Sequence, residues 1–227
     1  FIFAADRPGG FDHKSARLLG AIAPQAAAAL SNAQLLETAE ARARREALLN
    51  RIITAVRESL ELNVVLETTV RTLGQMLDLC RSYIAFVERA RRTVTVAYEY
   101  HVAEVGSTLG DFPIAGYGGT LLAQMERGEV FAVDDVEGDP RVAPFREKFL
   151  RPLGVKSLMY VPVLQDGTLA AVLGFSQCRF VRHWSEEEID FAQAIANQVS
   201  VAMRQAQLFE QQRRAAQYRA LLNRINS

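Results

Sequence analysis

The sequence predicts an α+β domain with an antiparallel sheet, and three observations support this fold class. Good helix formers dominate two long stretches, residues 12–60 and 186–223. Between them lie short runs of β-branched and aromatic residues, which are typical of strands. Short turns join two pairs of these runs, and such turns connect antiparallel strands. These elements form a domain from about residue 46 to 205, long enough to bury a full core.

Residues 12–60 are expected to form one long helix. No Gly occurs from residue 21 through 73 to end it, and the length suggests a connector between domains. Pro24 lies inside this stretch, so the helix either starts near it or kinks there. An interrupted apolar stripe with spacings of three and four predicts a weak coiled-coil seam. The stripe consists of Leu36, Ala39, Ala43, Leu49, Ile52 and Val56.

A second helix and a hairpin follow. Residues 63–79 have their apolar side chains on one side, although Gly74 lies among them. Residues 83–87 and 93–100 then follow the strand pattern, and the charged turn at 88–92 joins them as a hairpin.

The middle of the domain is less regular. A short helix is expected at residues 120–127 and a short strand at 130–133. Residues 134–149 contain Pro140 and Pro144 and are predicted to be irregular. A long irregular segment inside a compact domain is more often functional than idle.

A second hairpin and a long helix complete the domain. Residues 156–164 and 169–176 flank Asp166-Gly167, and Asp-Gly is the strongest short hairpin signal. Ser185 and Glu188 form a capping box that opens the final helix. A short heptad seam near its end consists of Ala215, Tyr218, Leu222 and Ile225.

The chain also contains an internal repeat. Residues 11–54 align without a gap to residues 184–227, and sixteen of the 44 positions are identical. A constant offset over such a length favours a true repeat over a shared helical composition. We therefore expect residues 1–45 to end a preceding unit and residues 206–227 to begin an outgoing helix. The start at Phe1 suggests a fragment of a longer protein with tandem units.

Composition excludes several classes of protein. Lys plus Arg and Asp plus Glu both number 26, and this balance argues against a nucleic-acid partner. No apolar run of about 18 residues occurs, so no segment is expected to span a membrane. The two Cys are too few for a disulfide scaffold and favour the cytoplasm.

No catalytic or metal-binding constellation stands out. Gly116-Tyr117-Gly118-Gly119 matches neither a dinucleotide fingerprint nor a phosphate loop, and a turn before a helix explains it. The acidic run 134–139 does not match a calcium loop and is interpreted as turn and cap residues. The three His and two Cys lack zinc spacing. We therefore expect no enzyme activity in this chain and no metal.

Aromatic residues gather in the predicted sheet and in the segment from 110 to 150. Core packing is one interpretation, and the other is an aromatic pocket that holds a flat ligand under a loop. The candidates for this pocket are Phe86, Tyr98, Tyr100, Phe112, Tyr117, Phe131, Phe145, Phe149 and Tyr160.

Several spaced motifs together resemble the GAF domain, a small-molecule sensor module of bacterial signalling proteins. They are VFAVDDV at 130–136, DPR at 139–141, GVKSLMYVPV at 154–163, Leu173-Gly174 and WSEEEI at 184–189. The resemblance covers residues 46–205, and residues 1–45 resemble the end of a preceding GAF domain. It implies a six-stranded antiparallel sheet with the terminal helices on one face and a ligand pocket on the other. It also implies parallel dimers through those helices and an effector such as a histidine kinase of a two-component system.

Within this family, Gln177-Cys178 and Trp184 look like the bilin-binding, phytochrome-like branch. That branch attaches its bilin through Cys-His about ten residues before the Val-Lys pair, where this chain has Phe145-Arg146. A covalent bilin is therefore not expected. The signature of cyclic-nucleotide-binding members is not recognisable either, so the cofactor stays unknown.

The leading functional hypothesis is a non-catalytic sensory module that binds a small molecule or transmits a change through its terminal helices. Its expected partners are a second copy, a small-molecule ligand and the neighbouring GAF and effector domains, with no nucleic acid and no membrane. The alternative is a ligand-free dimerisation and spacer module. A third hypothesis is an enzyme related to methionine sulfoxide reductases, which carry several reactive Cys, whereas this chain has two.

Overall fold

The computed structural model describes residues 13–58 and 62–225. In the first long helix, side chains are described at residues 23–40, 42–47 and 50. In the last long helix, side chains are described up to residue 218. The chain divides into two units, Phe1–Asn50 and Arg51–Ser227, which are described separately.

The first long helix, α1, runs from His13 to Glu58 without interruption. This confirms the predicted helix over the described residues. Pro24 lies inside α1, so the helix does not begin there.

The sheet has six strands, which is the architecture that the motifs implied. The strands are β1 (Arg81–Glu88), β2 (Thr93–His101), β3 (Gly110–Pro113), β4 (Phe131–Val133), β5 (Ser157–Gln165) and β6 (Thr168–Gln177). Their order is β3-β2-β1-β6-β5-β4, and every neighbouring pair is antiparallel.

Both predicted hairpins are present. In the second, Asp166 and Gly167 have φ angles of 50° and 75°, as a two-residue turn of type I′ requires. The sequence did not predict β3. Its four residues include Gly110 and Pro113, which have low strand propensity, and the strand forms at the sheet edge by pairing with β2.

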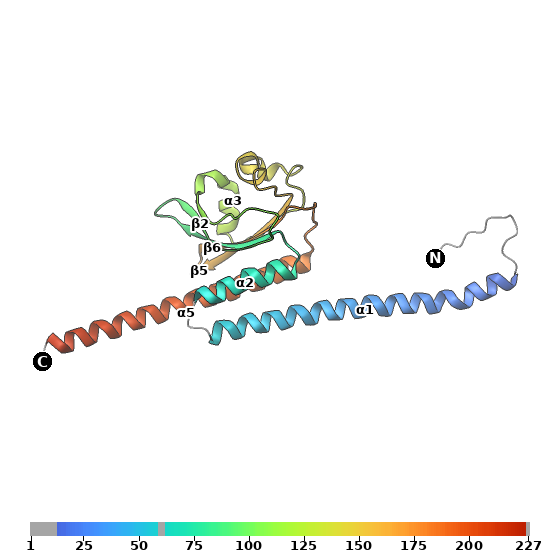
Figure 1. The fold of residues 1–227 in the computed structure, drawn as a ribbon, viewed down its shortest axis with the longest axis horizontal. Coiled ribbons are helices and arrows are strands. Elements are labelled where there is room, and N and C mark those ends of the chain that lie inside the picture. Colours follow the sequence, from blue (N-terminus) through green and yellow to red (C-terminus); the bar gives the residue numbers. More distant parts are fainter. Residues whose placement is uncertain (1–12, 59–61, 226–227) are drawn as a thin grey trace. The chain divides into compact units, whose positions relative to one another are not determined.

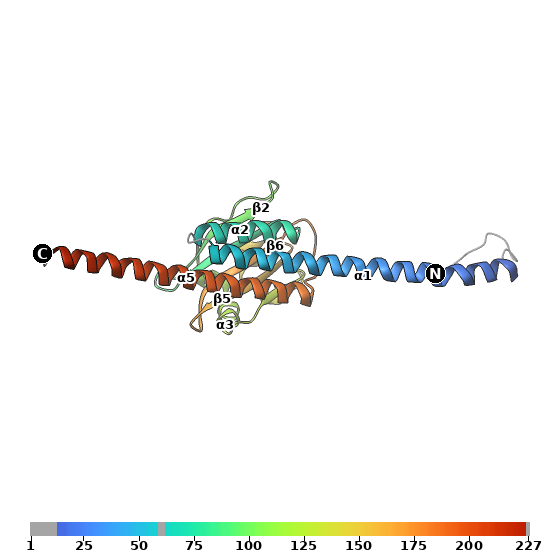
Figure 2. The ribbon, with the colours of Figure 1, turned by 90° about the horizontal axis from the view of Figure 1, so that it is seen from below.

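Two helices cover one face of the sheet. α2 (Leu62–Met76) contacts β1 and β2, and α5 (Glu186–Ile225) contacts β5 (Figures 1 and 2). We call this side of the sheet the helix face; Ile84, Val161 and Phe175 are fully buried there. The predicted capping box opens α5: the amide of Glu188 donates to Ser185 Oγ (3.2 Å), and the amide of Ser185 donates to Glu188 Oε2 (3.1 Å).

The opposite side, the lid face, carries Tyr83, Tyr160 and Val172. It is covered by η1 (Ile114–Tyr117), α3 (Gly119–Glu126), η2 (Pro140–Val142), α4 (Ala143–Phe145) and the π-helix η3 (Arg146–Leu150). We call residues 140–155 the lid. The prediction that residues 134–149 are irregular was wrong in part, because the lid folds into short helical turns. Pro140 and Pro144 occupy the first turns of η2 and α4, a place that tolerates proline.

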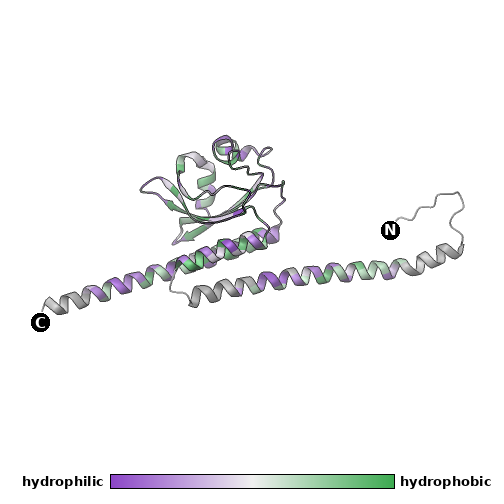
Figure 3. Cartoon of the chain, viewed as in Figure 1, coloured by the Kyte–Doolittle hydropathy of each residue, from purple (hydrophilic) through white to green (hydrophobic). Residues whose placement is uncertain are grey.

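The outer part of α5 has a different surface from the part along the sheet. Residues 207–218 are all exposed and mainly hydrophilic (Figure 3). Nearer the N-terminus of α5, the helix buries Phe191, Ile195 and Val199 in the domain. Within the described residues, no helix is both long and apolar enough to cross a bilayer.

Candidate functional site

The nine predicted pocket residues fall into two groups, on opposite sides of the sheet. Phe86, Tyr98 and Tyr100 lie on the helix face. The Tyr98 hydroxyl donates to Asn63 Oδ1 of α2 (2.6 Å), and its ring meets that of Phe86 edge-on at 6.2 Å. The ring of Tyr100 lies so close to Gly74 that a Cβ there would be 2.0 Å from Cδ1. These three residues pack α2 onto the sheet and do not reach the lid face.

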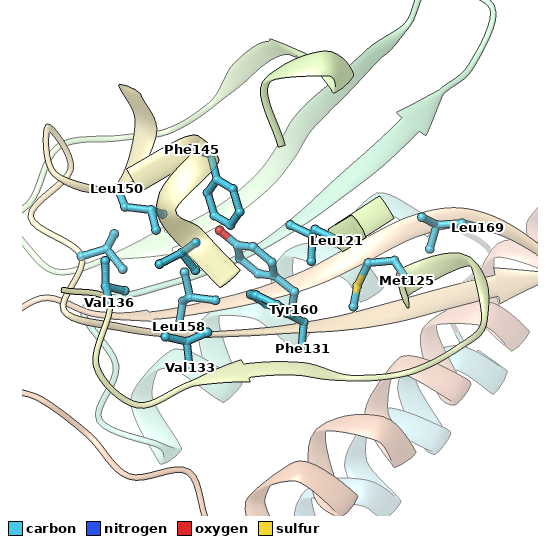
Figure 4. Packing of buried hydrophobic residues seen from close by; sticks show 12 residues of the cluster. Leu121, Met125, Phe131, Val133, Val136, Phe145, Leu150, Leu158, Tyr160 and Leu169 are labelled. Carbon is cyan, nitrogen blue, oxygen red and sulfur yellow. The ribbon is translucent and has the colours of Figure 1, made fainter. Parts of the chain in front are cut away.

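Three other predicted residues lie in the hydrophobic cluster under the lid. Phe131, Phe145 and Tyr160 are at most 6% exposed and come from β4, α4 and β5 (Figure 4). The close-up shows Tyr160 at the centre of this cluster, its hydroxyl directed towards Phe145. Residues far apart in sequence thus form one layer between sheet and lid.

The last three predicted residues close one side of the layer. Tyr117 of η1 stacks on Phe149 of the lid, with ring centroids 5.3 Å apart and planes 3° from parallel. Phe112 of β3 meets the edge of Phe149 at 6.2 Å. Gly116 permits this approach, since a Cβ on it would lie 2.5 Å from Phe149 Cε2. The Gly-rich segment therefore serves as a closely packed turn before α3.

Two small cavities remain within this layer. The larger, of about 50 Å³, is mainly apolar and lies between β1, β2, β6 and α3. The smaller, of about 30 Å³, lies between the lid and the start of β1, where Arg81 lines it. Tyr83, Tyr117 and Tyr160 line both. Pockets for drug-sized ligands occupy roughly 300–1,000 Å³. In this conformation the layer therefore has room for a few atoms only.

Two residues of this layer were missed by the sequence analysis. Tyr83 on β1 lies opposite Gly174 of β6, and a Cβ on Gly174 would be 2.3 Å from its Cζ. The alternation along 81–87 could have placed Tyr83 on the same face as Ala85 and Val87. Arg81 has no such signal, because its buried partner Glu99 is 18 residues away on β2.

The three tyrosines of the layer stay neutral well above physiological pH. Burial, and next the neighbouring Tyr160, raises the pKa of Tyr83 well above its usual value. Burial also raises the pKa values of Tyr117 and Tyr160, and a neighbouring tyrosine adds to each rise. Each hydroxyl therefore keeps its proton inside an apolar layer.

Both Cys are free thiols near the junction of β1 and β6. Cys80 is fully buried and donates to Gln177 Oε1 (2.8 Å). Burial raises the pKa of the Cys178 thiol to about 11. The thiolate is the nucleophilic form of cysteine, so this environment suppresses the reactivity that a thiol-based reductase needs.

The acidic run holds turns together. The carboxylate of Asp134 accepts from the amide of Trp184 (3.0 Å), Asp135 from the amide of Glu137 (3.0 Å), and Asp139 from the amide of Arg141 (2.8 Å). Across the described part of the chain, no group of three His, Cys, Asp or Glu is arranged to hold a metal ion.

The predicted seam residues of the long helices are exposed wherever their side chains are described. Those are Leu36, Ala39, Ala43, Ala215 and Tyr218. The side chains of Leu49, Ile52, Val56, Leu222 and Ile225 lie outside the described ones. The dimer through these helices stays a prediction.

Comparison with known proteins gives consistent matches. The family model described as GAF domain matches residues 61–203. The circadian input-output histidine kinase CikA of Thermosynechococcus vestitus is 26% identical over 203 residues; the match covers 86% of this chain and 28% of that protein. Most of the kinase therefore lies outside the matched part.

Solved structures share the fold. The phycocyanobilin-bound GAF domain of a cyanobacterial phytochrome is 25% identical, with a TM-score of 0.67, covering 72% of this chain and 96% of that one. The free methionine-R-sulfoxide reductase of Neisseria meningitidis is 16% identical, with a TM-score of 0.59, covering 72% and 90%. The latter likeness concerns the fold alone.

The residues of this chain do not fit a covalent bilin. At the place expected for the attachment Cys, Phe145 is 1% exposed within the cluster, and the adjacent Arg146 donates to the carbonyl of Asp139 (2.6 Å). The two cavities are also far smaller than a pocket for a drug-sized molecule. Any ligand held within these two cavities in this conformation must be much smaller.

Proposed function

The chain belongs to the GAF domain family, and from this premise we propose that residues 61–203 form a non-catalytic sensory module. An event on the lid face, either binding of a small molecule or contact with a neighbouring domain, changes the packing of the lid. The sheet passes this change to α2 and α5. The observation that carries the proposal is the position of one thin sheet between an aromatic layer with small cavities and two packed helices.

Direct hydrogen bonds tie the sheet to both helices. The hydroxyl of Ser82 on β1 donates to the carbonyl of Val70 in α2 (2.5 Å). The hydroxyl of Ser200 in α5 donates to the carbonyl of Leu164 on β5 (2.6 Å). Ser82 is the direct neighbour of Tyr83, which faces the lid. A shift of Tyr83 therefore moves the backbone that holds α2.

A second connection runs from the cluster to the start of α5. Phe131 packs under the lid on β4, and at the end of the same strand the carbonyl of Val133 accepts from Trp184 Nε1 (3.2 Å). Trp184 is 3% exposed and directly precedes the cap residue Ser185. Because β4 has three residues, a displacement of Phe131 is expected to reach the first turn of α5.

The output is proposed to lie in other domains of a longer protein. The similar CikA proteins are histidine kinases, so a kinase of a two-component system is the proposed effector. The internal repeat supports a neighbouring unit of the same family. Positions of α1 that align with buried residues of α5, such as Leu30 with Met203, are apolar as well.

We propose a homodimer through the long helices. Tyr218 is 64% exposed on the outer part of α5, where Leu208 and Phe209 are also exposed. Disulfide cross-linking of a Tyr218→Cys variant is expected to yield a dimer, with Gln217→Cys as a neighbouring control. A monomer by light scattering at high concentration, without a cross-linked product, would contradict the dimer.

The alternative function is a ligand-free dimerisation and spacer module. The small size of the two cavities is the observation in its favour. Native mass spectrometry of freshly purified chain separates the two functions. A stoichiometric small molecule that is lost on denaturation supports the sensory module. Chain without a bound molecule, together with amide exchange in α5 that stays the same when the lid is changed, supports the spacer module.

A further inference from the structure

The most unusual polar group of the molecule is the guanidinium of Arg81. Its side chain is 1% exposed and belongs to the first residue of β1, on the lid face. Nη2 donates to the carbonyl of Gly106 (2.7 Å), and Nε lies 3.2 Å from Glu99 Oε1. Among the described residues, neither Nε nor Nη1 has an acceptor in hydrogen-bonding geometry. Buried donors without partners are rare in folded proteins, so these atoms need an explanation.

Glu99 does not supply the missing acceptor. Its carboxylate, also 1% exposed, accepts from the hydroxyl of Ser107 (2.6 Å) and from the amide of Thr108 (2.8 Å). The hydroxyl of Thr108 donates to it as well. The unused hydrogen-bonding capacity is therefore all on the donor side, on Arg81. A guanidinium has five N–H groups and can serve two acceptors at once.

Arg81 lines the smaller cavity together with polar and aromatic neighbours. Thr108 and Ser176 line it too, and Tyr83, Tyr117 and Tyr160 line both this cavity and the larger, apolar one. The two cavities thus present a polar end with unused donors and an apolar end lined by Val94, Leu121 and Val172. An elongated molecule with an acceptor at one end and a hydrocarbon tail at the other matches this arrangement.

We propose that the lid face binds a small monocarboxylic acid with a short apolar tail. One carboxylate oxygen accepts from Arg81 Nη1, and the tail passes the three tyrosines into the larger cavity. A carboxylate is the acceptor that pairs best with a guanidinium. The inference rests on the proposed sensory function and names the class of ligand.

The lid provides the route of entry. Phe149 lines the smaller cavity and is held there by its stacking on Tyr117, by the edge contact with Phe112 and by its close approach to Gly116. Phe149 belongs to η3, a five-residue π-helix, and π-helical turns are frequent at functional sites. Movement of this one ring would enlarge the cavity and admit the acid.

Calorimetric titration of the full chain tests the proposal with butyrate and 1-butanol, which share a four-carbon skeleton. Butyrate is expected to bind the wild type, and Arg81→Lys is expected to weaken it about tenfold or more, since a charge-assisted hydrogen bond is lost. Lysine keeps a positive charge beside Glu99. Arg213→Lys, the same change at a residue 62% exposed on α5, is expected to leave butyrate affinity unchanged. Butanol is expected to bind both variants alike and weakly.

A second measurement uses the wild-type chain, so it tests the proposal even if the Arg81→Lys variant does not fold. In wild-type chain, the side-chain Nε resonance of Arg81 is expected to shift with butyrate and not with butanol. Three results would each overturn the carboxylate site: no butyrate binding to the wild type, equal butyrate affinity in Arg81→Lys, or an Arg81 resonance that does not shift with butyrate. A bound water would then be the partner of Nη1. These results would not contradict the proposed sensory function. That function is contradicted instead if a change made in the lid does not alter amide exchange in α5.

Discussion

Gly116→Ala places a methyl group in the contact that closes the lid. The new Cβ would lie 2.5 Å from Cε2 and 2.6 Å from Cζ of Phe149, whereas ordinary contacts begin at 3.4 Å. The ring must therefore retreat by roughly 0.9 Å. These atoms are the far end of a side chain in the lid, so the ring can move without the sheet moving. The stack on Tyr117 is lost or offset as a result.

The expected loss of stability is about 1–2 kcal/mol, at the lower end of the range for overpacked sites because the ring can yield. For a domain of this size, that corresponds to a melting temperature lower by roughly 2–8 °C. Differential scanning calorimetry measures the loss. Amide exchange over residues 140–155 is expected to become faster in the same variant, because the lid loses its main aromatic anchor.

Gly119→Ala is the matched control. It lies three residues further on, and a Cβ there meets nothing within 4 Å. As the first residue of α3, it is expected to tolerate Ala or gain slightly in stability. If Gly116→Ala melts at the wild-type temperature with an unchanged lid, the closed stack between Tyr117 and Phe149 is not the contact that holds the lid.

Three further predictions concern the same layer. Gly174→Ala is expected to destabilise the domain by about 1–3 kcal/mol in denaturant titrations, because its Cβ would meet the ring of Tyr83; wild-type stability would refute this close approach. Unfolded tyrosines ionise near pH 10 and the three buried ones do so higher, so above pH 10 the unfolded chain holds fewer protons and stability falls as pH rises. Tyr83→Phe is expected to reduce that slope by up to about 1.4 kcal/mol per pH unit and to leave the pH dependence of stability below pH 9 the same as in the wild type; an unaltered slope would count against the raised pKa. Alkylation of Cys178 by iodoacetamide at pH 8 is expected to be about a hundredfold slower than that of glutathione, since few of its thiols are ionised at a pKa of about 11; equal rates in mass spectrometry would contradict it.

Local signals predicted most of the fold. The Asp166-Gly167 turn and the Ser185–Glu188 capping box each depend on a few adjacent residues, and both are present with the expected geometry. β3 escaped prediction because its pairing with β2, rather than its own residues, makes it a strand. The lid escaped for a related reason: its short helical turns are held by packing on the cluster.

The candidate site was predicted less completely. Aromatic content located the layer, but it did not distinguish the two faces of the sheet, so Tyr98 and Tyr100 were grouped with Tyr160. Strict alternation along each strand would have separated them, but β2 has an extra residue: Ile84 pairs with Tyr98 and Ala85 with Val96, so the alternation changes at Ala97. Arg81 could not be found by any local rule, because its burial depends on Glu99 and on the chain around Gly106.

The central claim is that the sheet carries a change from the lid to the helices on its other face. Amide exchange of α5 over residues 191–203, compared between the wild type, Gly116→Ala and Gly119→Ala, tests it most directly. Exchange in this part of α5 is expected to change in Gly116→Ala alone. A change confined to residues 114–155, with α5 identical in all three proteins, would contradict the claim.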